Sequence, residues 1–470
     1  MFDAERDSAD HRAFAERCDG DRHHFRFIVS PEDADQLSDL KAFTRDLMVQ
    51  AERDLGTKLD WIGAEHWNTD NPHIHVIVRG VADDGRDLVI SRDYISQGLR
   101  ARAGHLVTLE LGPRSDLDIR RRLDTEVEAD RWTGLDRALE SQAARNDRII
   151  DLRRNVDHAL NGDTRSALVG RMRKLERLGL AQPLGAGRWY LSERTEPTLR
   201  TLGERNDIIK RIHRGLAELR IERGVGDYAL EEGDPARPII GRLIARGLDD
   251  ELQGSAYAVI DGTDGRTHHV RLPDLNATSD GAPGSIVELR RFKDAMGRER
   301  TAVAVRSDLP LAAQVEATGA TWLDRQLVAR EPAPLSSGGF GLEVRQAMNA
   351  RAEYLIRENL ARREGQRIIF ARDLLNTLRR RELDQQAARV TADSGLPYRP
   401  AVEGDVISGV YRQRLDLASG RFAMIDDGLG FSLVPWTPSL ERHLGREVVG
   451  IARTGRVEWT FARSRGLGIG

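Results

Sequence analysis

The stretch LDWIGAEHWNTDNPHIHVIVRG, residues 59–80, decides how the first part of this chain folds. Its two ends carry the pattern of strands, and the polar residues 68–72 between them predict a turn. Upstream, HHFRFIVSP at residues 23–31 alternates apolar and polar side chains and predicts another half-buried strand. Downstream, DDGRDLVI at residues 83–90 predicts a third strand after that pair.

A helix is expected between the first strand and the pair. Ser30 as N-cap, Pro31 at the first helical position and Asp33 three residues after the cap form a start signal, and Gly56 supplies the stop. The order strand, helix, strand, strand predicts an α+β sandwich with a largely antiparallel sheet.

Three histidines in this stretch stand at the spacing of a metal site. His73 and His75 lie two apart on a strand and therefore share one face, while Ile74 packs on the other. A tight hairpin brings His66 across the sheet beside them. Three neutral imidazoles leave a divalent ion with an open position, as in catalytic sites. Manganese, zinc and magnesium are candidates, and magnesium suits imidazole least.

The alternative without a metal is a pair of surface histidines, or core histidines that bind no ion. A single His-x-His would be weak evidence, but the third histidine and the acidic residues Glu65 and Asp70 in the hairpin favour a metal. His268 and His269 face opposite sides of a predicted strand and are interpreted as incidental.

The bulk composition excludes several classes of protein. The net charge of -3 means that any DNA contact must come from local patches. No apolar run is long enough to cross a membrane, and the polar N-terminus does not resemble a signal peptide. Cys18, the lone cysteine, can form no internal disulfide. A cytoplasmic location without membrane partners is expected.

The segment TRSALVGRMRKLERLGLAQPLGAGRWYLS at residues 164–192 predicts a helix followed by a strand-turn-strand. This pattern is typical of a winged helix-turn-helix, and it puts Arg171, Arg173, Lys174 and Arg177 on the helix that would contact DNA. Such wings also serve as protein-contact modules, and that alternative stays open.

Two distant segments resemble each other, GSAYAVIDGTDG at residues 254–265 and GRFAMIDDGLG at residues 420–430. Each lies between strand-like runs, which predicts two small β-barrel-like modules. The expected divisions are 1–115 (metal-binding domain), 116–200 (helical and winged-helix-like), 201–310 (first β module), 311–395 (helical) and 396–470 (second β module).

A family resemblance adds to this interpretation. HHFRFIVSP followed by HWNTDNPHIHVIVRG resembles the second and third motifs of plasmid-mobilisation relaxases of the T-DNA border endonuclease type, over about residues 20–140. Residues 420–446 resemble an uncharacterised region that commonly follows such relaxases. The resemblance implies a divalent ion on His66, His73 and His75 that polarises the scissile phosphate of single-stranded DNA at an origin of transfer. Arg26 and Ser30 are then candidate DNA contacts.

The same resemblance implies relaxosome proteins and a type IV secretion coupling protein as partners, and a tyrosine nucleophile upstream of HHFRFIVSP. No tyrosine precedes Tyr94, which follows the histidines and is the one candidate substitute. Three hypotheses follow. The chain is a relaxase whose longer form cuts; it is a DNA-binding relaxosome accessory or regulator that does not cut; or it is a hydrolase in which water replaces tyrosine and Glu65 or Asp70 is the base.

Overall fold

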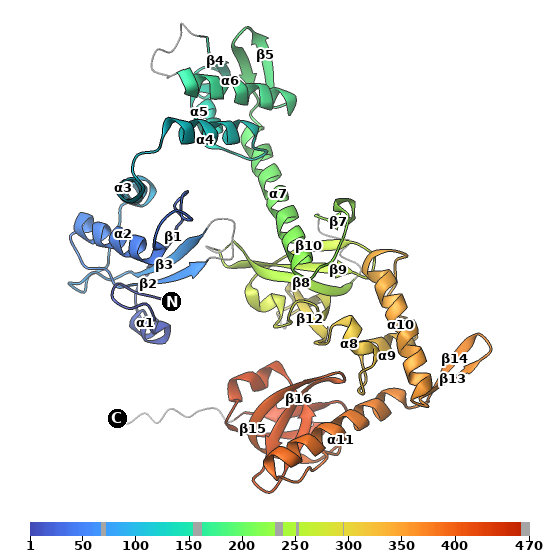
Figure 1. Cartoon of the computed structure of the whole chain (residues 1–470). Helices are drawn as coiled ribbons and strands as arrows, with labels where there is room; N and C mark the ends of the chain where they lie inside the picture. Colours follow the sequence, from blue (N-terminus) through green and yellow to red (C-terminus); the bar gives the residue numbers. More distant parts are fainter. Residues whose placement is uncertain (67–71, 154–161, 231–237, 251–252, 295, 462–470) are drawn as a thin grey trace. The chain divides into compact units, whose positions relative to one another are not determined.

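The protein is seen in a computed structural model, and its chain divides into two compact units, Met1–Gly203 and Glu204–Gly470. Helices and strands are labelled in Figure 1. Both units combine helices with mainly antiparallel sheets, which confirms the predicted α+β class. The structure describes residues 1–66, 72–153, 162–230, 238–250, 253–294 and 296–461.

The N-terminal part of the first unit is a sheet with helices against one face. Its strands are antiparallel in the order β1-β3-β2, so β3 is central. Ile74, Val76 and Val78 of β3 pack against α2 in a core that includes Phe43 and Leu47. The even-numbered side chains of β3 therefore face the helices, and the odd-numbered ones face the other way. The elements are α1 (His11–Arg17), β1 (His24–Val29), α2 (Leu40–Leu55), β2 (Trp61–His66), β3 (His73–Arg79), η1 (Tyr94–Gly98) and α3 (Leu99–Leu111).

Two local predictions in this part are wrong. Helix α2 begins at Leu40 rather than after Ser30, because the Asp39 side chain accepts hydrogen bonds from the backbone N–H groups of Lys41 and Ala42 and caps the helix there. The stop at Gly56 is confirmed, since this residue has φ of 69°. Residues 83–90 form no strand and contribute only an isolated bridge between Val81 and Asp87.

The second part of the first unit contains the predicted helix and hairpin. Helix α6 is followed by a turn at Gly179 and by the β5–β6 hairpin, and β4 completes a sheet in the order β4-β6-β5. The buried side chains of α6, among them Met172 and Leu175, pack on this sheet through Trp189 and Leu191. The elements are α4 (Asp116–Glu128), α5 (Gly134–Ala143), β4 (Ile149–Asp151), α6 (Gly162–Arg177), β5 (Ala181–Gly185) and β6 (Arg188–Leu191).

Helix α7 (Thr195–Glu218) leads into the second unit, where two β modules share one topology. In each, the long first strand pairs with both the second and the fourth, which gives the orders β12-β11-β8-β9-β10-β7 and β17-β16-β15-β18-β19. Neither sheet closes into a barrel within the described part of the chain. The elements are η2 (Val225–Asp227), β7 (Tyr228–Ala229), β8 (Ile239–Asp250), β9 (Ser255–Gly262), β10 (Thr267–Leu272), η3 (Leu275–Thr278), β11 (Ile286–Lys293), β12 (Glu299–Ser307), β15 (Val406–Leu417), β16 (Gly420–Asp426), β17 (Phe431–Pro435), η4 (Pro438–His443), β18 (Glu447–Arg453) and β19 (Arg456–Thr460).

The two modules agree in detail as well as in strand order. The register of the first strand shifts between Leu243 and Ala245 in one module and between Tyr411 and Gln413 in the other. A short 3₁₀ helix follows the third strand in both, η3 in one and η4 in the other. The sequence repeat therefore reflects a structural repeat.

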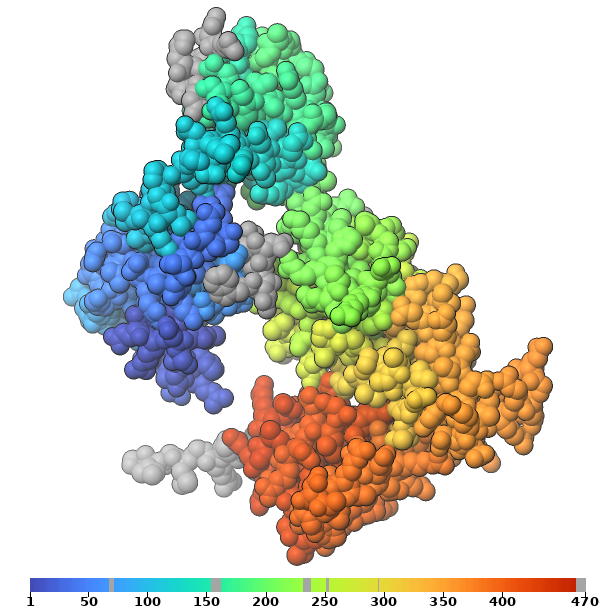
Figure 2. Space-filling view, in the orientation of Figure 1, coloured from blue at the N-terminus to red at the C-terminus, as the bar shows by residue number. Residues whose placement is uncertain are grey.

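The repeat extends into the helices that precede each β module. Residues 311–395, expected to be a helical region, also contain the β13–β14 hairpin, which follows α10 as the β5–β6 hairpin follows α6. In Figure 1 this hairpin extends beyond the end of α10, and Figure 2 shows it as an orange protrusion of the surface. The elements are α8 (Leu311–Val315), α9 (Trp322–Val328), α10 (Gly339–Arg357), β13 (Ala361–Glu364), β14 (Arg367–Phe370) and α11 (Leu374–Ser394).

A buried ion pair holds the same place in both helical segments. Arg171 of α6 binds Asp136 of α5 with two hydrogen bonds of 2.8 Å, and Arg351 of α10 binds Asp324 of α9 with two of 2.8 Å. Each guanidinium also donates to backbone carbonyls at matching positions before the helix that carries the aspartate. These carbonyls belong to Val127, Ala129 and Arg131 in the first copy and to Val315, Ala317 and Gly319 in the second.

Candidate metal centre

The sheet brings the predicted histidines together at one end of its central hairpin. His66 is the last residue of β2 and lies directly opposite His73, the first residue of β3. His75 follows two residues later and opposes Ala64 on β2 and Ile28 on β1. Pairing across strands and alternation along β3 place all three imidazoles on the face away from α2.

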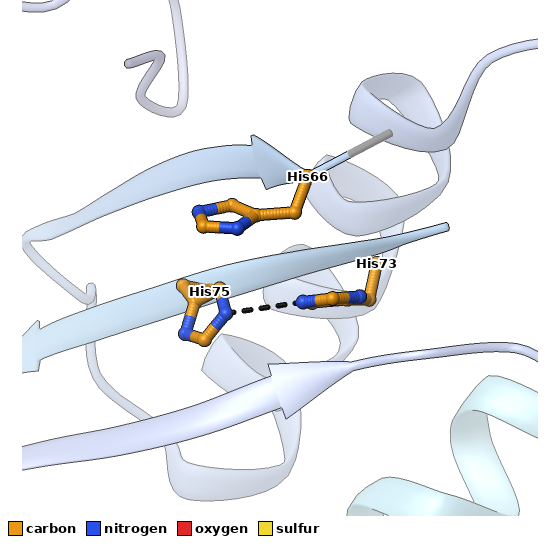
Figure 3. Close-up of side chains that lie close together, drawn as sticks. All are labelled: His66, His73 and His75. Carbon is orange, nitrogen blue, oxygen red and sulfur yellow. Dashed lines mark hydrogen bonds between the residues drawn. The ribbon is translucent and has the colours of Figure 1, made fainter. Parts of the chain in front are cut away.

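The imidazoles are close enough to share one ion. One ligand nitrogen of each of His66, His73 and His75 lies within 4.8 Å of the others. Figure 3 shows the three rings converging, with the Nε2 atoms of His73 and His75 3.2 Å apart. Two nitrogens bound to one tetrahedral ion at about 2.1 Å would be about 3.4 Å apart. The residues therefore fit a divalent ion, and the predicted cluster is a candidate metal centre.

Among the described residues, the side chains of β1 on this face are exposed. His73 is buried, whereas His66 and His75 are half-buried. On β1 the exposed side chain of Arg26 shares the face of His75, and its Nε donates a 2.9 Å hydrogen bond to Nε2 of His24. The guanidinium of Arg26 is thus exposed on the face of the sheet that carries the histidines. Ser30 is exposed just beyond the end of β1.

The two acidic candidates are not seen beside the imidazoles. Glu65 opposes Ile74, so its side chain points to the helix face of the sheet, where a carboxylate oxygen lies 2.9 Å from Nζ of Lys41. Asp70 lies outside the described residues. Of the two bases of the hydrolase hypothesis, Glu65 is therefore turned away from the histidines.

Tyr94 is held by the helices. Its hydroxyl donates a 2.8 Å hydrogen bond to Asp54 near the end of α2, and Arg102 of α3 donates two more hydrogen bonds to the same carboxylate. The ring packs against the core between the sheet and α2. Burial, with the hydrogen bond to Asp54, raises the pKa of Tyr94 well above its ordinary value. The phenol is thus protonated at neutral pH and lies with the core on the helix side of the sheet.

The four basic residues of α6 that were predicted to contact DNA lie in different environments. The assignment of Arg171 is wrong, because its side chain is fully buried in the ion pair with Asp136 and cannot reach a phosphate. Lys174 lies 3.0 Å from Asp130 and is largely covered. Arg177 pairs with Glu128 at 3.3 Å, and Arg173 is exposed. Arg173 and Arg177 are thus the accessible members of the set.

Comparisons with known proteins cover the other part of the chain. A family model described as protein of unknown function (DUF3363) matches residues 168–299 and 290–468. No match was found among curated proteins or among solved structures. The matched residues begin within α6 and include both β modules, whereas the histidine cluster lies before them. Among the described residues, no helix is long and apolar enough to span a membrane.

Proposed function

We propose that this chain, which belongs to the family of proteins of unknown function (DUF3363), is a relaxase-like protein that binds a divalent ion through His66, His73 and His75 and acts on single-stranded DNA at an origin of transfer. The observation that carries the proposal is the convergence of three imidazoles on the open face of an antiparallel sheet. The motifs around residues 23–31 and 66–80, which resemble those of plasmid-mobilisation relaxases, supply the substrate class.

The chemistry divides between the ion and the side chains around it. A divalent ion bound there supplies Lewis-acid stabilisation to a phosphate oxygen. His73, buried at the start of β3, fixes the position of the centre, while the half-buried His66 and His75 border the side that a phosphate must enter. Arg26, on the same face, offers a second positive charge to the DNA backbone. Three imidazoles favour zinc or manganese over magnesium.

Binding without cutting is the second candidate function, and the position of Tyr94 favours it. Cleavage by covalent transfer needs a tyrosine oxygen that can reach the phosphate and lose its proton. The hydroxyl of Tyr94 donates a hydrogen bond to Asp54, and burial raises the pKa of Tyr94. A chain that relied on this tyrosine alone would act as a relaxosome accessory or regulator. Other relaxosome proteins and a type IV secretion coupling protein are proposed partners in either case.

The test is to incubate the full chain with a single-stranded origin-of-transfer oligonucleotide and manganese, and to look for binding and for a covalent adduct on a denaturing gel. Binding that manganese strengthens, with an increase that His73→Ala abolishes, supports the proposal. An adduct that Tyr94→Phe abolishes identifies Tyr94 as the nucleophile and rejects the non-cutting candidate. DNA binding that neither manganese nor His73→Ala changes would contradict the proposed role of the histidines.

A further inference from the structure

The hairpin of β11 and β12 extends beyond the sheet to which it belongs. Strand β8 pairs with β11 only from Ile286 to Leu289, while β11 and β12 continue to pair with each other from Arg290 and Ala302 to Lys293 and Glu299. Residues 290–294 and 296–302, called here the β11–β12 arm, therefore form a two-stranded ribbon. The core of the module does not require this ribbon, because its buried members on these strands are Val287, Leu289 and Val303.

The arm concentrates positive charge in a chain whose net charge is -3. All five of its basic side chains, Arg290, Arg291, Lys293, Arg298 and Arg300, are exposed. Nε of both Arg298 and Arg300 lies 3.1 Å from a single carboxylate, that of Asp294. Nε of Arg290 lies 3.2 Å from a carboxylate oxygen of Glu288, whereas neither Arg291 nor Lys293 has an acidic partner among the described residues. The excess of cations favours a polyanion as the occupant.

An exposed aromatic ring lies among these charges. Phe292 is 50% exposed, although phenylalanine is usually buried, and it stands directly opposite Arg300 on β12. Arg290, two residues before it on β11, projects from the same face. A flat ring between two guanidinium groups can stack on a nucleic-acid base while the guanidiniums contact the phosphates on either side.

The repeated module serves as an internal comparison, because its equivalent hairpin lacks these features. Strand β15 pairs with β18 from Glu447 to Ile451, which leaves little of β18–β19 beyond the sheet. There Arg453 and Arg456 share one carboxylate, that of Glu458. The arm is thus an addition to the first copy rather than a requirement of the fold.

The position of the arm in the topology agrees with a nucleic-acid ligand. A first strand that pairs with the second and the fourth, with a helical turn after the third, is the strand order of an open OB-fold barrel, and the arm joins its fourth and fifth strands. In that fold the loop between these two strands contacts oligonucleotides. Topology alone assigns no ligand, so the assignment rests on the cations and the ring.

We propose that the β11–β12 arm binds single-stranded nucleic acid, with the ring of Phe292 stacked on a base and the surrounding arginine and lysine side chains on the phosphates. Single strands fit better than a duplex, because the faces of bases in a duplex are already covered by their neighbours. The arm binds independently of the histidine cluster and needs no metal.

The experiment measures binding of the full chain to a fluorescent oligothymidylate by anisotropy, in EDTA. Phe292→Ala weakens binding about 5- to 150-fold, as expected for the loss of one stacked base, and Phe292→Trp retains it. Arg291→Ser with Lys293→Ser lowers the slope of log affinity against log salt concentration by about 1.4, or about 0.7 for each lost phosphate contact. Arg453→Ser with Arg456→Ser, on the equivalent hairpin, is the matched control and leaves binding unchanged.

Several results would overturn the proposal. It fails if Phe292→Ala binds as tightly as the original chain, if the control pair weakens binding as much as the arm variants, or if a duplex binds more tightly than the single strand. Binding that disappears in EDTA or in His73→Ala would assign all DNA contact to the histidine cluster. Thermal unfolding of each variant shows whether it is folded. If Phe292→Ala does not fold, Phe292→Trp keeps the test valid.

Discussion

Replacing the buried arginine of either helical copy should destabilise that copy alone. Arg171→Met removes five hydrogen bonds, two to Asp136 and three to backbone carbonyls. It leaves the carboxylate of Asp136, whose side chain is fully buried, without its counter-ion. Breaking such a pair costs about 3–5 kcal/mol, and the backbone carbonyls that lose donors put the expected loss toward the upper end of that range.

Hydrogen exchange read by mass spectrometry measures this loss in the full chain. A decrease of about 4 kcal/mol in the free energy of opening accelerates exchange about a thousandfold in peptides from α5, α6 and β6. Arg351→Met, the matched variant, has the same effect on peptides from α9, α10 and β14. Adding Asp136→Leu to Arg171→Met removes the unpaired charge and restores part of the protection, although it also removes the hydrogen bonds that Asp136 accepts from Thr133 at the start of α5.

The opposite pattern would refute this reasoning. If Arg171→Met exchanged like the original chain but bound DNA more weakly, Arg171 would be a phosphate contact after all, as the sequence suggested. If Arg171→Met accelerated exchange equally in α5 and α9, the two copies would not be independent folding segments.

Three further outcomes are expected. Burial, with a smaller contribution from the charge of Arg211, lowers the pKa of His269 from 6.5 to about 4. The contribution of the neutral imidazole to the free energy of unfolding is therefore complete above pH 6.5 and is lost as pH falls toward 4, by about 3 kcal/mol in urea titrations. His269→Phe should remove this loss. Tyr94→Phe should cost about 1 kcal/mol in the same titrations and leave ion binding unchanged in dialysis, whereas loss of the ion would link Tyr94 to the centre. Gly409→Ala places Cβ 2.3 Å from the carbonyl oxygen of Asp426. This contact should lower the melting temperature of the second unit by an amount equivalent to about 1–3 kcal/mol. An unchanged melting temperature would show that β15 can shift freely.

The histidine site could be predicted because it depends on local rules. Alternation on one strand and a tight hairpin suffice to place His66, His73 and His75 together. The start of α2 could not be fixed in the same way, since Ser30 and Asp39 are both good caps and the choice depends on how α2 packs on the sheet. Orientation across the sheet likewise separates Glu65 from its neighbour His66.

The repeat was only half visible in the sequence. The β modules share glycine turns at similar spacing, whereas the helical copies share only short stretches, Thr-x-Leu-Asp-Arg-x-Leu at residues 133–139 and 321–327 and Arg-x-x-x-Leu-x-Arg at residues 171–177 and 351–357. Arg171 follows Asp136 by 35 residues, whereas Arg351 follows Asp324 by 27, so no fixed period marks them. A basic residue on a helix is usually solvated, and pattern alone does not distinguish one that pairs inward. The β11–β12 arm did leave a signal, the basic run with one aromatic at residues 290–300.

The most direct test of the central claim is the stoichiometry of divalent ion bound to the purified full chain, measured for zinc and manganese by equilibrium dialysis. The arrangement of imidazoles predicts one ion per chain, its loss in His73→Ala, and its retention in His24→Ala, which removes an exposed histidine from the same face of the neighbouring strand. Equal stoichiometry in His73→Ala and the original chain would contradict the metal centre.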